Sequence, residues 1–248
     1  MNNQIFKKIN SVVKSPPKIC IVLGSGLGSF SEILKNKKYL LYSDIEGFPT
    51  TSVAGHVGQF IYGYLDDVPI LCAQGRFHYY EGFTFEEVGI IIKVFNYYDP
   101  KKIIITNSVG CLRLDWNIGD FISINKFIDF SFINSNSIQE YKFDDNITNL
   151  KNGTYAYTIG PTYETCAEIK EIISCGGDVV GMSTFPEYLM CNKLDINPLI
   201  ISCLTNYGAG LINKEVKHTD VLDNALKVEN KFEVLIKNII QNIAHQKI

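Results

Sequence analysis

Short apolar runs alternate along the chain with segments of helical period. Apolar runs that stop at glycine or polar residues predict buried strands, here at residues 18–23, 68–74, 102–107, 121–124, 154–159, 178–182 and 198–205. Strands that alternate with helices are typical of a largely parallel sheet whose crossovers pass through helices. The pattern therefore predicts an α/β fold.

Apolar residues three or four positions apart predict helices at residues 29–34, 85–97, 164–174 and 186–193. The strongest helical pattern covers residues 221–243, and we expect this segment to cover one face of the sheet. Residues 131–152 are polar and rich in asparagine, which predicts a long loop.

The chain has 248 residues, of which 46% are hydrophobic, and it contains neither a repeat nor a Pro/Ser-rich linker. A chain of this length and composition can bury a large core as one unit. We therefore expect a single domain over residues 1–248.

Charge and composition argue against several classes of protein. Lys and Arg number 23 against 26 Asp and Glu, so the basic surplus of a nucleic-acid binder is missing. The apolar runs fall short of the roughly 20 residues that cross a bilayer, and the N-terminal residues lack the order of a secretory signal. Seven cysteines without a Cys-x-x-Cys pair are interpreted as reduced core residues. We expect a cytoplasmic protein with no membrane and no nucleic-acid partner.

The glycine-rich segment 24–28, Gly-Ser-Gly-Leu-Gly, follows a predicted strand and precedes a predicted helix. Glycines let backbone N–H groups approach an anion closely, and the start of a helix adds partial positive charge, so phosphate is the natural ligand. A dinucleotide site with Asp44 on a ribose is one alternative, although the spacing is G-x-G-x-G rather than G-x-G-x-x-G. A tight turn that merely needs glycine is another.

A second polar cluster, residues 74–82, follows another strong strand. Arg76 offers two donors for a phosphate, and His78 adds a third whose tautomer Glu81 can fix. For any one of these residues a solvated polar turn is the simpler interpretation. Their concentration within nine positions favours a binding site.

Three further residues have both a chemical and an ordinary interpretation. His56, between glycines, is an accessible ring or a plain loop histidine. Glu164 is a first-turn acid of a helix, or a carboxylate that accepts N–H protons from a ring that Tyr163 covers. Asn206 is a turn residue or an amide that reads a heterocycle.

The sequence gives no support for a metal or for a covalent nucleophile. The four histidines are scattered without metal-ligand spacing, and no Gly-x-Ser-x-Gly elbow is present. We expect no cofactor and no metal site.

Seven motifs occur in one order along residues 19–226, and in that order they resemble the trimeric, low-molecular-mass type of purine nucleoside phosphorylase. They begin at Gly24, Gly55, Gln74, Thr106, Gly160, Val180 and Thr205 and read GSGLG, GHVG, QGRFHYYEG, TNSVG, GPTYET, VGMST and TN. The resemblance implies a three-layer αβα fold with a central mixed, largely parallel sheet. It also implies reversible phosphorolysis, in which orthophosphate as co-substrate displaces a purine from C1′ of a nucleoside with inversion.

The resemblance assigns roles to matching positions. Its phosphate-binding residues are Ser25, His56, Arg76, His78, the backbone N–H of Ser108, and Ser183. Its ribose-binding residues are Tyr80, Met182 and His218, and its base-binding residues are Tyr163, Glu164 and Asn206. Of these, His78, Glu164 and Asn206 carry the catalysis.

Asn206 also indicates the substrate class, because the adenine-specific relatives have an aspartate there. An amide paired with Glu164 suits 6-oxopurines such as those of inosine and guanosine. Methylthioadenosine phosphorylase and a catalytically weak nucleoside-binding relative are the alternatives. The family implies a homotrimer whose neighbouring subunit completes the site, but residues 125–152 are shorter than usual and identify no such residue.

Overall fold

A computed structural model describes residues 3–51, 57–133, 137–143, 147–212 and 218–245. Its strands are β1 Ile19–Leu23, β2 Lys35–Leu41, β3 Gln59–Leu65, β4 Val68–Gln74, β5 Lys102–Cys111, β6 Phe121–Asp129, β7 Gln139–Lys142, β8 Asn152–Tyr157, β9 Val179–Gly181 and β10 Leu199–Tyr207. Its α-helices are α1 Asn3–Ile9, α2 Phe85–Val88, α3 Ile90–Tyr97, α4 Cys166–Ser174, α5 Phe185–Lys193, α6 His218–Lys227 and α7 Glu229–His245. Short 3₁₀ helices lie at Gly28–Ile33, Tyr42–Asp44 and Tyr79–Glu81.

The strands form one mixed sheet in the order β10-β6-β8-β9-β5-β1-β4-β3-β2, with β7 beside β6. Four of its neighbouring strands, β4, β1, β5 and β10, run parallel to one another. Their carboxyl ends therefore lie at the same edge of the sheet, where ligands of open α/β sheets bind.

One end of the sheet closes into a ring. Strand β10 pairs with β5 on one side and with β6 on the other, and β6, β8 and β9 complete the path back to β5. The ring fixes the ends of β5, β9 and β10 relative to one another.

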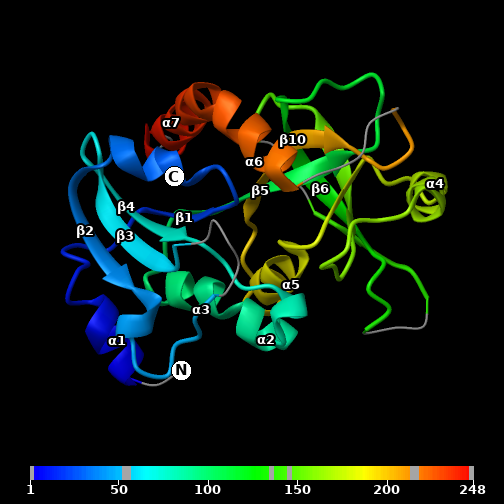
Figure 1. The fold of residues 1–248 in the computed structure, drawn as a ribbon. Coiled ribbons are helices and arrows are strands. Elements are labelled where there is room, and N and C mark those ends of the chain that lie inside the picture. Colours follow the sequence, from blue (N-terminus) through cyan, green and yellow to red (C-terminus); the bar gives the residue numbers. More distant parts are fainter. Residues whose placement is uncertain (1–2, 52–56, 134–136, 144–146, 213–217, 246–248) are drawn as a thin grey trace.

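Helices cover both faces of the sheet, as Figure 1 shows, with α6 and α7 on one side and α1, α3 and α5 on the other. Strand β1 explains this arrangement, because its five residues are all buried and alternate between the two faces. Cys20 and Val22 pack in the core beneath α1, α3 and α5, whereas Ile19, Ile21 and Leu23 pack with Phe232 and Ile236 of α7. A strand buried on both faces gives the continuous apolar run seen in the sequence.

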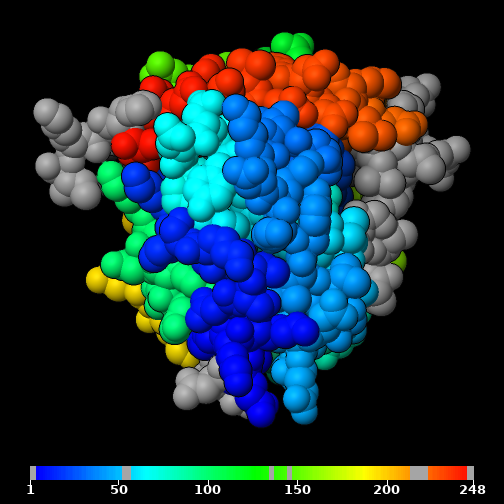
Figure 2. Space-filling model, turned by 90° about the vertical axis from the view of Figure 1, so that its left-hand side faces the viewer, coloured from blue at the N-terminus to red at the C-terminus, as the bar shows by residue number. Residues whose placement is uncertain are grey.

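The open edge of the sheet lies away from the ring. Figure 2 looks onto this edge, where the residues of α1 lie below those of β2 and β3, and the C-terminal helices lie above. Strand β2 is the edge strand, and most of its residues are exposed or half-buried.

The structure confirms the predicted α/β, three-layer fold and corrects several elements. Strands β2 and β3 and helix α1 were not predicted, and β7 lies inside the Asn-rich stretch 131–152 that predicted only a loop. The predicted helix 85–97 divides at Gly89, where Met190 of α5 lies so close that a Cβ would meet it at 2.7 Å. Residues 221–243 divide into α6 and α7 at Val228, and residues 29–34 form a 3₁₀ rather than an α-helix.

All seven cysteines are free. Five of them are buried, as predicted, but Cys166 is exposed and Cys175 is half-buried.

Candidate active site

A cavity of about 230 Å³ opens at the carboxyl ends of the parallel strands. Ten of the twelve site residues predicted from the sequence line it: Ser25, Arg76, His78, Tyr80, Ser108, Tyr163, Glu164, Met182, Ser183 and Asn206. They come from six loops or strand ends that are separated in the sequence. We call the part around Arg76 the arginine end and the part around Glu164 the carboxylate end.

The glycine-rich turn after β1 forms one wall of the arginine end. Gly24 lies so close to β5 that a Cβ would meet the carbonyl oxygen of Thr106 at 2.7 Å. The Gly24 N–H donates to Thr106 Oγ1, and the Ser108 hydroxyl donates to the carbonyl of Ser25 at 2.9 Å. Glycine at this position thus holds the turn against β5, and Ser25 and Ser108 lie together as a result.

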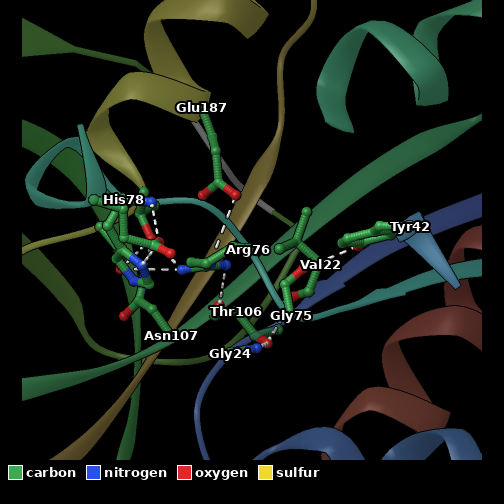
Figure 3. A network of polar contacts seen from close by, with 12 residues as sticks. Val22, Gly24, Tyr42, Gly75, Arg76, His78, Thr106, Asn107 and Glu187 are labelled. Carbon is green, nitrogen blue, oxygen red and sulfur yellow. Dashed lines mark hydrogen bonds and ion pairs between the residues drawn. The ribbon is translucent and has the colours of Figure 1, made fainter. Parts of the chain in front are cut away.

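Arg76 lies at the centre of a buried polar network, drawn in Figure 3, and only 2% of its surface is exposed. Its Nη1 donates to the hydroxyls of Ser183 and Thr184 at 3.0 and 2.9 Å, and its Nη2 donates to the carbonyl of Thr106 at 2.6 Å. Glu187 on α5 lies 3.6 Å from its Nε. These contacts fix the plane of the guanidinium at the edge of the cavity.

His78 is oriented by a carboxylate. Its Nδ1 lies 3.0 Å from Oε1 of Glu81, and the side chains of both residues are almost fully buried. Burial lowers the pKa of His78, Arg76 lowers it further, and Glu81 opposes both effects. A neutral ring that donates from Nδ1 leaves Nε2 as an acceptor. The ring also stacks on Tyr80, whose pKa burial raises to about 12, so the phenol stays protonated.

Glu164 contributes a carboxylate to the lining of the cavity. Its Oε1 accepts a hydrogen bond of 2.7 Å from the Thr158 hydroxyl. Burial raises the pKa of this carboxyl, and the Thr158 hydrogen bond opposes the shift. Helix α4 begins only at Cys166, so the interpretation of Glu164 as a first-turn acid is wrong, and Glu168 takes that place.

Asn206, near the end of β10, lines the same cavity as Glu164. Its Oδ1 accepts from the hydroxyl of Thr205 at 3.0 Å, and its Nδ2 donates to the carbonyl of Tyr207 at 3.2 Å. An amide nitrogen carries two protons, so this hydrogen bond leaves the second Nδ2 proton available for another acceptor. A carboxylate and an oriented amide at one end of a cavity can read the edge of a nitrogen heterocycle.

Comparison with known proteins agrees with this geometry. The family model described as Phosphorylase superfamily matches residues 18–241. The chain belongs to this superfamily. It is 33% identical to purine nucleoside phosphorylase 1 of Geobacillus stearothermophilus over 92% of each chain.

Solved structures of this superfamily share the fold. The chain superposes on Schistosoma mansoni purine nucleoside phosphorylase in complex with adenosine with a TM-score of 0.85, 26% identity, and coverage of 98% of this chain and 96% of that one. The complex of that enzyme with inosine gives a TM-score of 0.83 at 26% identity over 96% and 94% of the two chains. Both a 6-aminopurine and a 6-oxopurine nucleoside are thus bound by relatives.

The structure does not describe the side chains of two predicted site residues. His56 lies outside the described residues, and His218 begins α6 but its side chain lies outside the description. The dinucleotide alternative finds no support, since Asp44 is exposed in a 3₁₀ helix and does not line the cavity. Among the described residues no cluster of metal ligands occurs, and no helix is long and apolar enough to span a membrane.

Sequence reasoning missed several residues that orient this phosphorylase-type site. Thr158 and Glu187 were not singled out, and Thr184 and Thr205 were noted only as members of motifs. Thr184 and Glu187 repeat a Thr-x-x-Glu spacing found twice elsewhere in the chain, a signal that was available from the sequence.

Proposed function

We propose that this protein is a purine nucleoside phosphorylase that cleaves 6-oxopurine nucleosides, such as inosine and guanosine, with orthophosphate. The observation that carries the proposal is one cavity whose lining contains Arg76 and His78 together with Glu164 and Asn206. The relatives named purine nucleoside phosphorylase support the same reaction.

The arginine end suits orthophosphate. Arg76, Ser25, Ser183 and the backbone N–H of Ser108 are the donors that we assign to the anion, with Arg76 supplying the charge. The acceptor Nε2 of His78 can share the one proton of monohydrogen phosphate. We expect His56 to lie beside the phosphate and the ribose.

The ribose lies between the two ends in this proposal. Tyr80 and Met182 line the cavity, and we assign them to the ribose and His218 to its 5′-hydroxyl. As the glycosidic bond lengthens, positive charge develops on the sugar and negative charge on the purine. Phosphate held by Arg76 faces the cationic sugar and then bonds to C1′, which releases the base.

The carboxylate end stabilises the departing purine. In our assignment the Nδ2 of Asn206 donates to N7 as negative charge develops there, and ionised Glu164 accepts from N1–H. Tyr163, which is 41% exposed, covers the ring. An N1–H is present in 6-oxopurines and absent from adenine, so a carboxylate at this position favours inosine and guanosine.

One experiment tests the reaction and the substrate class together. Purified protein is incubated with inosine, guanosine, adenosine or methylthioadenosine, with and without orthophosphate, and the released base is quantified. We expect phosphate-dependent release of hypoxanthine and guanine, with much slower release from the two 6-amino substrates. Tight purine binding with no phosphate-dependent release from any nucleoside would refute the proposal in favour of a binding protein.

A further part of the proposal concerns domain organisation, assembly and location. We propose one nucleoside phosphorylase domain over residues 1–248, assembled as a cytoplasmic homotrimer without cofactor or metal. Light scattering on the same preparation measures the mass, and a value matching one copy would refute the trimer.

A further inference from the structure

The chain contains three Thr-x-x-Glu segments, each at the start of a helix. They are Thr84 to Glu87 at α2, Thr165 to Glu168 at α4, and Thr184 to Glu187 at α5. This spacing is the signature of a capping box, in which the two side chains satisfy backbone N–H groups of the first turn. The first two segments form it: each threonine hydroxyl accepts from the N–H of its glutamate, and each glutamate accepts from the N–H of its threonine.

The third segment has the same sequence and does not form the box. Thr184 is the N-cap residue of α5, yet its side chain makes no capping hydrogen bond. Glu187 is fully buried, and its carboxylate lies 3.6 Å from Nε of Arg76. Figure 3 shows this carboxylate above the guanidinium. Both side chains have turned from the helix backbone towards the arginine end of the cavity.

The Thr184 hydroxyl contacts residues from two different elements at the arginine end of the cavity. It accepts from Nη1 of Arg76 at 2.9 Å and from Nδ2 of Asn107 at 2.8 Å, and it lies 3.3 Å from Oγ of Ser183. A hydroxyl has two acceptor positions, so these two donors fill them. Arg76 follows β4, and Asn107 precedes Ser108 on β5, so one oxygen ties together the elements that carry the proposed phosphate donors.

The backbone of Thr184 is held in an unusual conformation to make these contacts. Its φ is +72° and its ψ is −41°, and the residue is completely buried. The left-handed region is rarely adopted by a β-branched residue, and such conformations persist where the surroundings fix them, often at functional sites. Among the described non-glycine residues with positive φ, the others are asparagine, aspartate or phenylalanine.

We propose that Thr184 is a positioning residue for orthophosphate, whose hydroxyl fixes the guanidinium of Arg76 and the Asn107 side of the site. This inference rests on the proposed function. An arginine binds an oxyanion through the direction of its N–H groups as well as its charge, so an unfixed guanidinium keeps its charge and loses affinity. Glu164 and Asn206 share none of the hydrogen bonds of Thr184, so we expect the carboxylate end to keep its affinity for a purine.

The test is isothermal titration of orthophosphate and, separately, of hypoxanthine into wild-type protein, Thr184→Val and Thr184→Ser. Valine keeps the branched shape and removes the hydroxyl, whereas serine keeps the hydroxyl. A hydrogen bond to a charged group contributes enough for phosphate affinity to fall roughly ten- to hundredfold in Thr184→Val. We expect Thr184→Ser to retain phosphate affinity to within a small factor and hypoxanthine affinity to be unchanged in both variants.

The matched control is Thr84→Val, which removes the same hydroxyl from a capping box that does form. This control lowers the thermal midpoint of unfolding, because it removes a helix cap, and leaves phosphate affinity unchanged. A double variant with Arg76→Lys gives the second readout. If Thr184 acts through the guanidinium fork, Thr184→Val weakens phosphate binding much less in that background than in wild-type protein.

The outcomes separate the two proposals. Unchanged phosphate affinity in Thr184→Val, or equal losses of phosphate and hypoxanthine affinity, would overturn the positioning role, as would failure of serine to retain binding. Should Thr184→Val not fold, Thr184→Ala removes the hydroxyl without the branched side chain and carries the same expectation. Wild-type protein that binds orthophosphate but releases no base from inosine refutes the proposed function alone, and wild-type protein that binds no orthophosphate refutes this inference.

Discussion

The hydrogen bond from Thr158 to Glu164 offers a direct test of the carboxylate end. The hydroxyl donates to Oε1 at 2.7 Å and lowers a pKa that burial raises above its ordinary value of 4.5. In the substitution Thr158→Val the shape of the side chain is kept and the donor is lost. The pKa of Glu164 then rises further, because its ionised form loses a partner.

The expected loss of hypoxanthine affinity follows from the one hydrogen bond that the substitution removes. One charge-assisted hydrogen bond contributes about 1.5–3 kcal/mol, and the lower figure applies here because Glu164 is only partly buried. Since every 1.4 kcal/mol is a factor of ten, we expect hypoxanthine to bind about tenfold more weakly at mildly acidic pH. The loss should shrink as the pH rises above the pKa of Glu164 in both proteins.

The sign of the pH dependence is fixed by the direction of the shift. Glu164 accepts from N1–H only when ionised, so purine affinity falls as the pH drops through its pKa. In the free protein the same raised pKa means that the folded state binds more protons than the unfolded state above pH 4.5. Folding stability from this group therefore decreases as the pH rises from 4.5 through the folded pKa.

The assay is calorimetric titration of hypoxanthine from mildly acidic to neutral pH, without phosphate, so that the titration of phosphate itself does not contribute. Thr158→Ser keeps the donor and should follow wild type, while Glu164→Gln should bind weakly with no dependence on pH in this range. The reasoning is wrong if Thr158→Val leaves the pH of half-maximal affinity unmoved, or if the serine variant shifts it equally.

Three further predictions address other parts of the site. Asn206→Ala should reduce turnover of inosine by two to three decades, on the order of 3–4 kcal/mol of transition-state stabilisation, with little change in phosphate affinity; steady-state kinetics checks this, and equal losses in both would contradict it. Gly24→Ala should destabilise the protein by about 1–3 kcal/mol, because its Cβ would lie 2.7 Å from the Thr106 carbonyl; urea unfolding measures this, and wild-type stability would show that the turn can yield. Glu81→Gln should lower the pKa of His78 further, since Glu81 raises it; NMR titration of the ring reports the direction, and an upward shift would exclude the assigned pairing.

The sequence predicted those parts of the fold that are buried on both faces. Strands β1, β4 and β5 are continuous apolar runs because helices cover each of their faces. Strand β2, Lys35–Leu41, has no such signal, since it is an edge strand whose residues are mostly exposed. The break at Gly89 depends on its contact with Met190, a hundred residues away, and no local pattern reports a contact of that kind.

The residues of the site likewise fall into those that the sequence indicates and those that only the fold reveals. The residues that we assign to the ligand lie in short motifs near strand ends, so Arg76, Glu164 and Asn206 stood out, and the structure brings them to one cavity. Residues that orient them are ordinary threonines and glutamates. Thr158 and Thr184 differ from the many other hydroxyl residues only in what lies opposite them, which depends on the fold.

The ring of strands has a consequence for the segment that connects β6 to β8. Strands β6 and β8 are neighbours in the ring, so the segment that links them begins and ends on paired strands. Asn107 and Asn206 lie on β5 and β10, which pair directly with each other and not through this connection. An asparagine-rich, shortened connection is therefore compatible with an intact pairing of the two strands that carry Asn107 and Asn206.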